Sequence, residues 1–259
     1  MAPSDRRGRL ELLLERHGVA IAAGEPLAIL LDRLAAPDAP TAVHDPAEAE
    51  RVHIADSLAG LEVEELRNAA VIGDVGAGAG LPGLVLAAVL PATRVALVES
   101  AGRKCEFLRS AADAMRLTNV EVVWSRAEEW RGGLDACDIV CARALASLPV
   151  LCEYAAPLLR MGGVLVAWKG AVDDEEAGDA AAAAAHLGLA VEPVRAVVPF
   201  PGSERRTLHV VRKIASTPAG YPRRAGMATK RPLSAKNCAE SAPTSANQAR
   251  SGQIRRARR

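Results

Sequence analysis

A glycine-rich segment flanked by carboxylates has the residue types of a cofactor-binding loop. The apolar run at 71–75 suggests a buried strand, and residues 76–83 then supply four glycines before a helix that we expect to begin at Pro82. Glycines let backbone approach a ligand closely, and a helix N-terminus favours a negatively charged group nearby. Glu99 lies 25 residues after Asp74, where a carboxylate can accept hydrogen bonds from both ribose hydroxyls. The pattern predicts a site for an adenosine-containing cofactor.

The loop alone does not identify that cofactor. Residues 78–83 satisfy the GxGxxG dinucleotide pattern, which is a weak signal by itself, and a tight turn without any ligand also explains the glycines. Asp74 precedes the first loop glycine, a placement suited to a ligand with a cationic amino-acid end and no pyrophosphate. A second acid, Glu128, follows the third expected strand, where methyltransferases contact the adenine. These two acids favour S-adenosylmethionine over NAD(P).

The surrounding sequence alternates short apolar strands with amphipathic helices, which predicts a parallel, doubly wound α/β sheet. Strands are expected at 70–75, 94–99, 120–124, 139–142, 164–168, 190–198 and 207–213, and helices at 82–90, 103–116, 148–159 and 173–187. Only residues 199–206 separate the last two strands, too few for a crossover helix, so these strands should form an antiparallel hairpin at the sheet edge. A seven-stranded, mostly parallel sheet with this terminal hairpin matches the Rossmann-like fold of class I methyltransferases.

Three regions are expected along the chain. Residues 1–60 should form an N-terminal helical cap, with a capping box at 45–48 that starts a helix through His53 and Asp56. Residues 61–213 should form the Rossmann-like domain. Residues 214–259 are rich in Ser, Pro, Ala, Gly and Arg and lack apolar periodicity, so we expect a disordered basic tail.

Composition narrows the class of protein. Of the 259 residues 50% are hydrophobic, enough for a sizeable core, while the longest apolar run, 81–90, is half the length that a bilayer requires. No secretory signal opens the chain, and the five cysteines lack paired spacing, so we expect a cytoplasmic protein with reduced thiols and no metal. The tail carries a net charge of about +9 and the rest about −8, which suggests a polyanionic partner.

Seven segments, in one order, resemble the glucose-inhibited division protein B family, the bacterial 16S ribosomal RNA (guanine-N7) methyltransferases. The resemblance covers about residues 40–213. It rests on residues 52–58, 74–83, 103–109, 125–129, 142–148, 168–170 and 202–206.

The resemblance implies S-adenosylmethionine as cofactor and one guanine of 16S RNA as substrate. The residues expected to contact the cofactor are Gly76, Gly78, Leu81, Glu99, Ala127, Glu128 and Arg143. Guanine N7 carries an in-plane lone pair, so no general base is expected, and positioning should dominate catalysis. Arg143 is the candidate catalytic residue, because the segment after the fourth strand faces the methyl group in this fold.

Cationic residues near the ends of expected strands are candidates for holding RNA. They are Lys104, Lys169, Arg205 and Arg206, although solvated charges or surface salt bridges explain them as well. His53 and Asp56 lie one helical turn apart and either bond each other or stand at the mouth of the site.

We therefore expect a monomeric, S-adenosylmethionine-dependent enzyme that methylates guanine N7 in 16S RNA or the small ribosomal subunit, without a metal or a membrane. An NAD(P)-dependent oxidoreductase and a noncatalytic RNA-binding protein with a methyltransferase-like fold are the alternatives. Family members usually carry Trp-Asn and Asn-Leu-Thr before the His53 helix, where this chain has residues 34–36 and 39–41 of other types. The cap has therefore diverged, which leaves the exact target guanine open.

Overall fold

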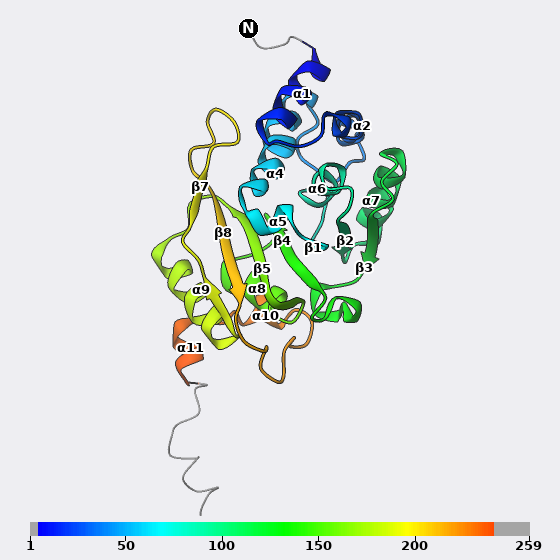
Figure 1. Ribbon diagram of the computed structural model, residues 1–259. Helices are drawn as coiled ribbons and strands as arrows, with labels where there is room; N and C mark the ends of the chain where they lie inside the picture. The colour runs from blue at the N-terminus through cyan, green and yellow to red at the C-terminus, as the bar shows by residue number, and fades with distance from the viewer. Residues whose placement is uncertain (1–4, 241–259) are drawn as a thin grey trace, which may run out of the picture.

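A mixed sheet with strand order β3-β2-β1-β4-β5-β8-β6 forms the centre of the computed structural model, which describes residues 5–240 (Figure 1). The first five strands run parallel, as the alternating pattern predicts. The strands are β1 (Val71–Val75), β2 (Arg94–Glu99), β3 (Val120–Trp124), β4 (Cys137–Arg143), β5 (Leu159–Lys169), β6 (Leu189–Val191), β7 (Arg195–Val197) and β8 (Arg206–Lys213).

The antiparallel end of the sheet differs in detail from the expected hairpin. The pairing itself is confirmed, because β7 runs antiparallel to β8. However, β8 lies between β5 and β6 and is not at the edge. The single strand expected at 190–198 is two strands, β6 and β7, separated at 192–194. Pro193 falls in this break, since proline has no N–H for a ladder. The sheet therefore has eight strands where seven were expected.

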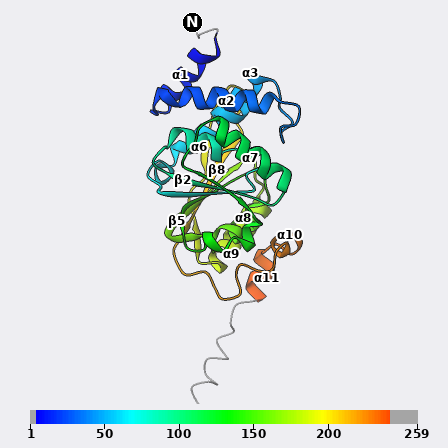
Figure 2. The same cartoon turned by 90° about the vertical axis from the view of Figure 1, so that its right-hand side faces the viewer.

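Helices cover both faces of the sheet (Figure 2). One face packs under α6 (Gly83–Val89) and α7 (Gly102–Ala114), the other under α8 (Leu148–Ala155) and α9 (Asp174–His186). The alternation is visible within β2, where Val95 and Leu97 join one core and Ala96 and Val98 the other. Both faces of these strands are buried, as a doubly wound sheet requires.

The region before β1 is helical, as expected. Figure 2 shows α1 and α2 as an additional layer above α6 and α7. The N-cap half of the predicted capping box is observed: the Asp45 side chain accepts a hydrogen bond from the Glu48 N–H at 2.8 Å. The elements are α1 (Arg6–Arg16), η1 (Ile21–Ala23), α2 (Gly24–Ala35), α3 (Pro46–Ala49), the π-helical η2 (Glu50–Ala55), α4 (Asp56–Leu58), η3 (Ala59–Glu62) and α5 (Glu64–Arg67).

The expectation of a disordered tail from residue 214 is wrong for 214–240. This part of the chain folds back below α8 and α9 and contains α10 (Met227–Lys230) and α11 (Ala235–Glu240). Its ordering depends on a few isolated anchors, such as the buried Ala228 and Leu233, which produce no periodic pattern. Residues 241–259 lie outside the described residues. In the described part of the chain, no helix is long and apolar enough to cross a membrane.

A tight contact joins the cap to the sheet. The indole Nε1 of Trp168, at the end of β5, donates a hydrogen bond to the backbone oxygen of Asp56 at 2.8 Å. Gly60 lies directly against the same ring, since a Cβ built there would be 2.2 Å from a Trp168 ring carbon. Any side chain at position 60 would therefore push the cap away from β5.

We expect Gly60→Ala to lower the free energy of unfolding by about 1–3 kcal/mol, because the added methyl overpacks the Trp168 contact. Gly178→Ala is the matched control: Gly178 lies on the exposed side of α9, with no atom within 4 Å of a built Cβ. That change should raise stability by about 0.5–1 kcal/mol through helix propensity. Urea unfolding of both variants is the measurement, and equal effects would contradict the overpacking argument.

Candidate functional site

The glycine loop after β1 adopts backbone conformations that its glycines make possible. Gly76, Gly78 and Gly80 have φ angles of +69°, +56° and +87°, in the left-handed region that residues with a Cβ avoid. A Cβ on Gly76 would lie 2.6 Å from Leu145, and one on Gly80 would lie 2.3 Å from Leu84. At Gly78 the nearest atom is 3.7 Å away, so the loop is open on this side. A ligand can approach the backbone there.

Two carboxylates accept hydrogen bonds from the backbone of this loop and of the helix start that follows it. Asp74, 1% exposed, accepts a hydrogen bond from the Gly83 N–H at 2.8 Å. Burial raises the pKa of Asp74 to about 7, although the Gly83 N–H and the nearby Arg143 oppose the shift. Glu99 accepts hydrogen bonds from the N–H groups of Gly78 at 3.1 Å and Ala101 at 2.8 Å, one at each carboxylate oxygen. The acids at the ends of β1 and β2 thus fix the backbone of the expected cofactor loop.

Arg143, at the end of β4, is tied to the cap. Its Nη1 donates hydrogen bonds to Asp56 Oδ2 at 2.9 Å and to the Val52 backbone oxygen at 3.1 Å. Asp56 is fully buried, and Arg206 at the start of β8 places its Nε 3.3 Å from the other carboxylate oxygen, Oδ1. That ion pair lacks hydrogen-bond geometry, so within the described residues Oδ1 has no hydrogen-bond donor. Asp56 therefore joins two arginines from distant parts of the sequence.

His53 completes this cluster. Burial and the neighbouring Arg143 lower the pKa of His53 to about 4, so the imidazole is neutral at neutral pH. Arg143 Nη2 lies 3.3 Å from His53 Nδ1, and Thr41 Oγ1 lies 3.0 Å from Nε2. Nδ1 also lies 3.2 Å from the Val52 backbone oxygen, so both ring nitrogens of His53 are engaged by neighbouring groups of the protein. Of the two expectations for His53 and Asp56, a direct bond between them is not found in the described structure; Arg143 lies between them.

The backbone geometry of the cap accounts for this convergence. Residues Glu50–Ala55 form a π-helical segment, and Asp56 follows it directly. A π-bulge changes the direction of the side chains that follow, and such bulges are frequent at functional sites. Here the Val52 oxygen, His53 and Asp56 all face Arg143. The periodicity of the sequence predicts a helix in this segment but not its π geometry.

The residues expected at the adenine end lie in η4 (Ala127–Glu129), directly after β3. The backbone N–H of Ser125 donates a hydrogen bond to the backbone oxygen of Glu99 at 3.0 Å, which joins the ends of β3 and β2. Glu128 is 8% exposed and accepts a hydrogen bond from the Gly226 N–H at 2.8 Å. Sequence reasoning missed Gly226, because it lies in the region expected to be disordered.

The four expected RNA-binding cations have different surroundings. Lys169 pairs with Glu176 at 2.8 Å, and Arg206 pairs with Asp56. Lys104 is half-buried and Arg205 exposed, and neither has an ion pair within residues 5–240. Arg205 and Arg206 border a hollow of about 340 Å³ where β5 ends. It is lined by Gly170, Ala171, Phe200, Gly202, Ser203, Arg205 and Arg206.

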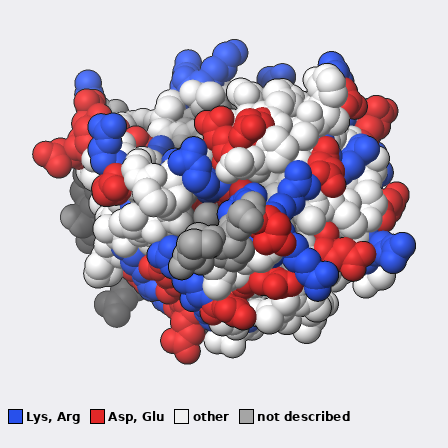
Figure 3. Space-filling model, turned by 90° about the horizontal axis from the view of Figure 1, so that it is seen from above, with Lys and Arg blue, Asp and Glu red and all other residues white. Residues whose placement is uncertain are grey.

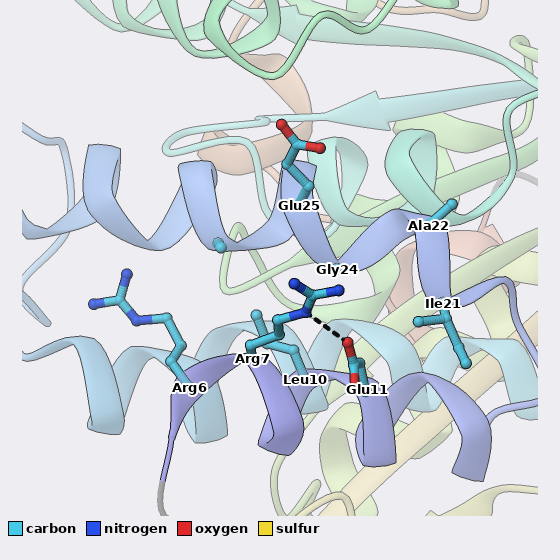
Figure 4. Close-up of a pocket in the computed structure, with 9 residues that line it drawn as sticks. Arg6, Arg7, Leu10, Glu11, Ile21, Ala22, Gly24 and Glu25 are labelled. Carbon is cyan, nitrogen blue, oxygen red and sulfur yellow. Dashed lines mark hydrogen bonds and ion pairs between the residues drawn. The ribbon is translucent and has the colours of Figure 1, made fainter.

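A larger groove lies elsewhere, between α1 and α2 (Figure 4). Its volume is about 550 Å³, and Arg7 and Glu11 form an ion pair at 2.8 Å on its wall. None of the expected cofactor residues lines it. Figure 3, which looks onto this end of the molecule, shows basic and acidic side chains intermingled. The groove therefore has no connection to the chemistry expected at the sheet edge.

Comparison with solved structures supports the fold. A SAM-dependent O-methyltransferase from Thermotoga maritima superposes with a TM-score of 0.50 at 15% sequence identity, covering 69% of this chain and 73% of that protein. At this identity the similarity concerns the fold alone. It agrees with the class I methyltransferase fold expected from the strand order and the antiparallel β8.

Comparison with sequences shows closer relationships. Ribosomal RNA small subunit methyltransferase G of Rubrobacter xylanophilus is 44% identical over 187 residues, which cover 70% of this chain and 72% of that protein. The protein of the same name from Pelotomaculum thermopropionicum is 42% identical over 197 residues, covering 74% and 82%. The family model described as GidB, rRNA small subunit methyltransferase G, matches residues 33–203. The chain belongs to this family of ribosomal RNA methyltransferases.

Proposed function

We propose that this enzyme transfers the methyl group of S-adenosylmethionine to N7 of one guanine in 16S ribosomal RNA. Membership of a family of small-subunit ribosomal RNA methyltransferases supports the reaction class and the substrate class. The single observation that carries the proposal is the meeting of the open glycine loop with Arg143 at the carboxyl ends of adjacent strands β1 and β4. Ligands of open α/β sheets bind at this edge.

The residues at this edge fit the cofactor. Glu99 would accept hydrogen bonds from the ribose hydroxyls, and Ala127 and Glu128 would contact the adenine. The remaining backbone contacts would come from the loop, where Gly78 is open to a ligand. Gly76 and Leu81 are the other contacts proposed there. S-adenosylmethionine supplies a methyl group on a cationic sulfur, which makes that methyl carbon electrophilic.

The chain's own contribution is to orient guanine, because the reaction needs no proton transfer. N7 attacks with its in-plane lone pair, so the N7–carbon bond forms as the carbon–sulfur bond breaks, and positive charge moves from sulfur to the base. No proton is removed, which agrees with the pKa of about 4 that makes His53 a weak base. Arg143 retains N–H groups on Nη2 and Nε beyond those given to Asp56, Val52 and His53. We propose that one of them is donated to guanine O6.

RNA would be held beside this edge by cations. Lys104 and Arg205 are the best placed, because neither is engaged in an ion pair within residues 5–240. Lys169 and Arg206 would have to share or leave their present partners, Glu176 and Asp56. We further propose that the enzyme acts as a monomer in the cytoplasm.

Methyl transfer to unmodified 16S RNA tests the proposal. Labelled S-adenosylmethionine is supplied with naked RNA or with assembled small subunits, and the modified base is mapped. A single N7-methylguanine is the expected product, and the better substrate identifies the assembly state. Cofactor binding without labelling of any RNA would refute the substrate, and absence of cofactor binding would refute the enzyme.

We expect Arg143→Lys to lower kcat by about tenfold or more, because lysine keeps the charge near Asp56 but cannot donate in several fixed directions. The matched control is Arg160→Lys. Arg160 pairs with Asp138 at the opposite end of β4, so turnover should be unchanged. Single-turnover kinetics is the measurement, and an unaltered rate in Arg143→Lys would remove this residue from the reacting centre.

Cofactor affinity should depend on pH through Asp74. Burial raises the pKa of Asp74 from 3.8 to about 7, so the carboxyl is mostly protonated below pH 7. The folding stability linked to this shift is fully present below pH 3.8 and is lost as the pH rises through 7. A cationic ligand nearby favours the ionised form, so binding should release a proton. We expect S-adenosylhomocysteine, which has the same amino-acid end, to bind about tenfold more tightly at pH 8 than at pH 6.

Calorimetry in buffers of different ionisation enthalpy measures this proton release. Asp74→Asn should abolish both the release and the pH dependence. Glu129→Gln, which changes an exposed acid beside the adenine end, should retain both. A pH-independent affinity in the unaltered protein would show that Asp74 does not sense the ligand charge.

A further inference from the structure

Residues 214–240, called here the strap, are attached to the helical layer of α8 and α9 at several points. Arg223 Nε donates to the carboxylate of Glu153, a residue that is 1% exposed, at 2.6 Å. The ring of Tyr221 meets His186 edge-on with centroids 5.7 Å apart, and Leu233 is buried in the core on this face. The strap lies beyond the family match, which ends at residue 203.

The strap reaches the end of β3 and contacts the proposed adenine site. The Gly226 N–H donates to Glu128 Oε1 at 2.8 Å. Thr229 Oγ1, in α10, lies 3.1 Å from the hydroxyl of Tyr154, a residue of α8. Gly226 has a φ of +80°, a conformation that suits glycine in the turn before α10. Within residues 5–240, Glu128 Oε2 has no hydrogen-bond partner. One oxygen of this carboxylate is therefore held, and the other is available.

We propose that the strap is part of the cofactor site: the Gly226 N–H positions Glu128 so that its free oxygen accepts a hydrogen bond from the 6-amino group of adenine. This inference rests on the proposed function, because it assumes an adenosine cofactor at this edge. The amino group is the donor that distinguishes adenine from hypoxanthine, and a carboxylate oxygen is a suitable acceptor. Gly226 acts through Glu128 and is a positioning residue.

The physical basis is preorganisation. A glutamate side chain has several rotamers, and fixing one of them before the ligand arrives lowers the entropy lost on binding. The strap supplies the fixing hydrogen bond, and its anchors at Arg223, Tyr221 and Leu233 hold Gly226 in place. Loss of these anchors should weaken the binding of adenine-containing ligands while leaving the methyl-transfer step unaffected.

The test detaches the strap in the full chain. Leu233→Asp places a charge at a buried apolar anchor, and Ile214→Asp, where the native side chain is 61% exposed, makes the same chemical change at the start of the strap as a control. Hydrogen exchange at the Gly226 amide reports whether the strap has left Glu128. The probes are S-adenosylhomocysteine and S-inosylhomocysteine, which replaces the 6-amino group with a carbonyl oxygen.

We expect Leu233→Asp to expose the Gly226 amide, to weaken S-adenosylhomocysteine binding by about tenfold, and to reduce the preference for the adenine probe. KM for the cofactor should rise with little change in kcat. The control should match the unaltered protein in both ratio and affinity. An unchanged preference with a deprotected Gly226 amide would overturn the inference, even if methylation continues.

A second variant guards against misfolding. Gly226→Ala has nothing within 4 Å of the added Cβ, but the left-handed φ disfavours alanine, so it weakens the turn without placing a charge in the core. If Leu233→Asp is unfolded, a lower adenine preference in folded Gly226→Ala supports the proposal and an unchanged preference overturns it. Failure of the unaltered protein to bind S-adenosylhomocysteine would instead refute the proposed function.

Discussion

The fully buried carboxylate of Asp56 is the interaction on which the arrangement of the site depends. An ionised group removed from water needs opposite charges and hydrogen bonds, and leaving it unpaired would cost several kcal/mol. Arg143 from β4 and Arg206 from β8 supply those charges, while Trp168 from β5 binds the backbone of the same residue. The cap can satisfy this residue only by docking over the carboxyl ends of β4 and β5 and the amino end of the antiparallel β8. The orientation of Arg143 is therefore a result of how the cap docks.

The acids of the cofactor edge share one structural role. Asp74, Glu99 and Glu128 each accept a backbone N–H, and each donor belongs to or borders a glycine-containing turn. Turns of this kind have little side-chain packing to hold them, and a carboxylate that accepts from the backbone limits their motion. Asp74, whose pKa is raised to about 7, adds negative charge to this edge when a cationic ligand favours its ionised form. The same side chains therefore hold the turns in place and favour a positively charged ligand.

The features that sequence could predict are local ones. The alternation of strands and helices and the tight glycine turn after β1 follow from residue types within short windows, and the structure agrees with them. The cofactor contacts expected of the loop and of Glu99 stay predictions. The partners of Asp56 could not be predicted in this way, because Arg143 lies 87 residues away and Arg206 comes from the last strand. The strap was missed for a related reason: its order comes from single anchors on a surface formed earlier in the chain, and no repeating pattern marks them.

The position of β8 has a consequence for how the sheet is completed. This strand is the last to be synthesised, yet it lies between β5 on one side and β6 and β7, which both pair with it, on the other. Until it is in place, β5 presents an unpaired edge of hydrophobic residues, the kind of edge that invites intermolecular pairing. A chain interrupted before residue 206 lacks β8 and would retain that edge. Truncated translation products of this protein are therefore candidates for aggregation and for rapid proteolysis, whereas synthesis through β8 removes the hazard in a single pairing step.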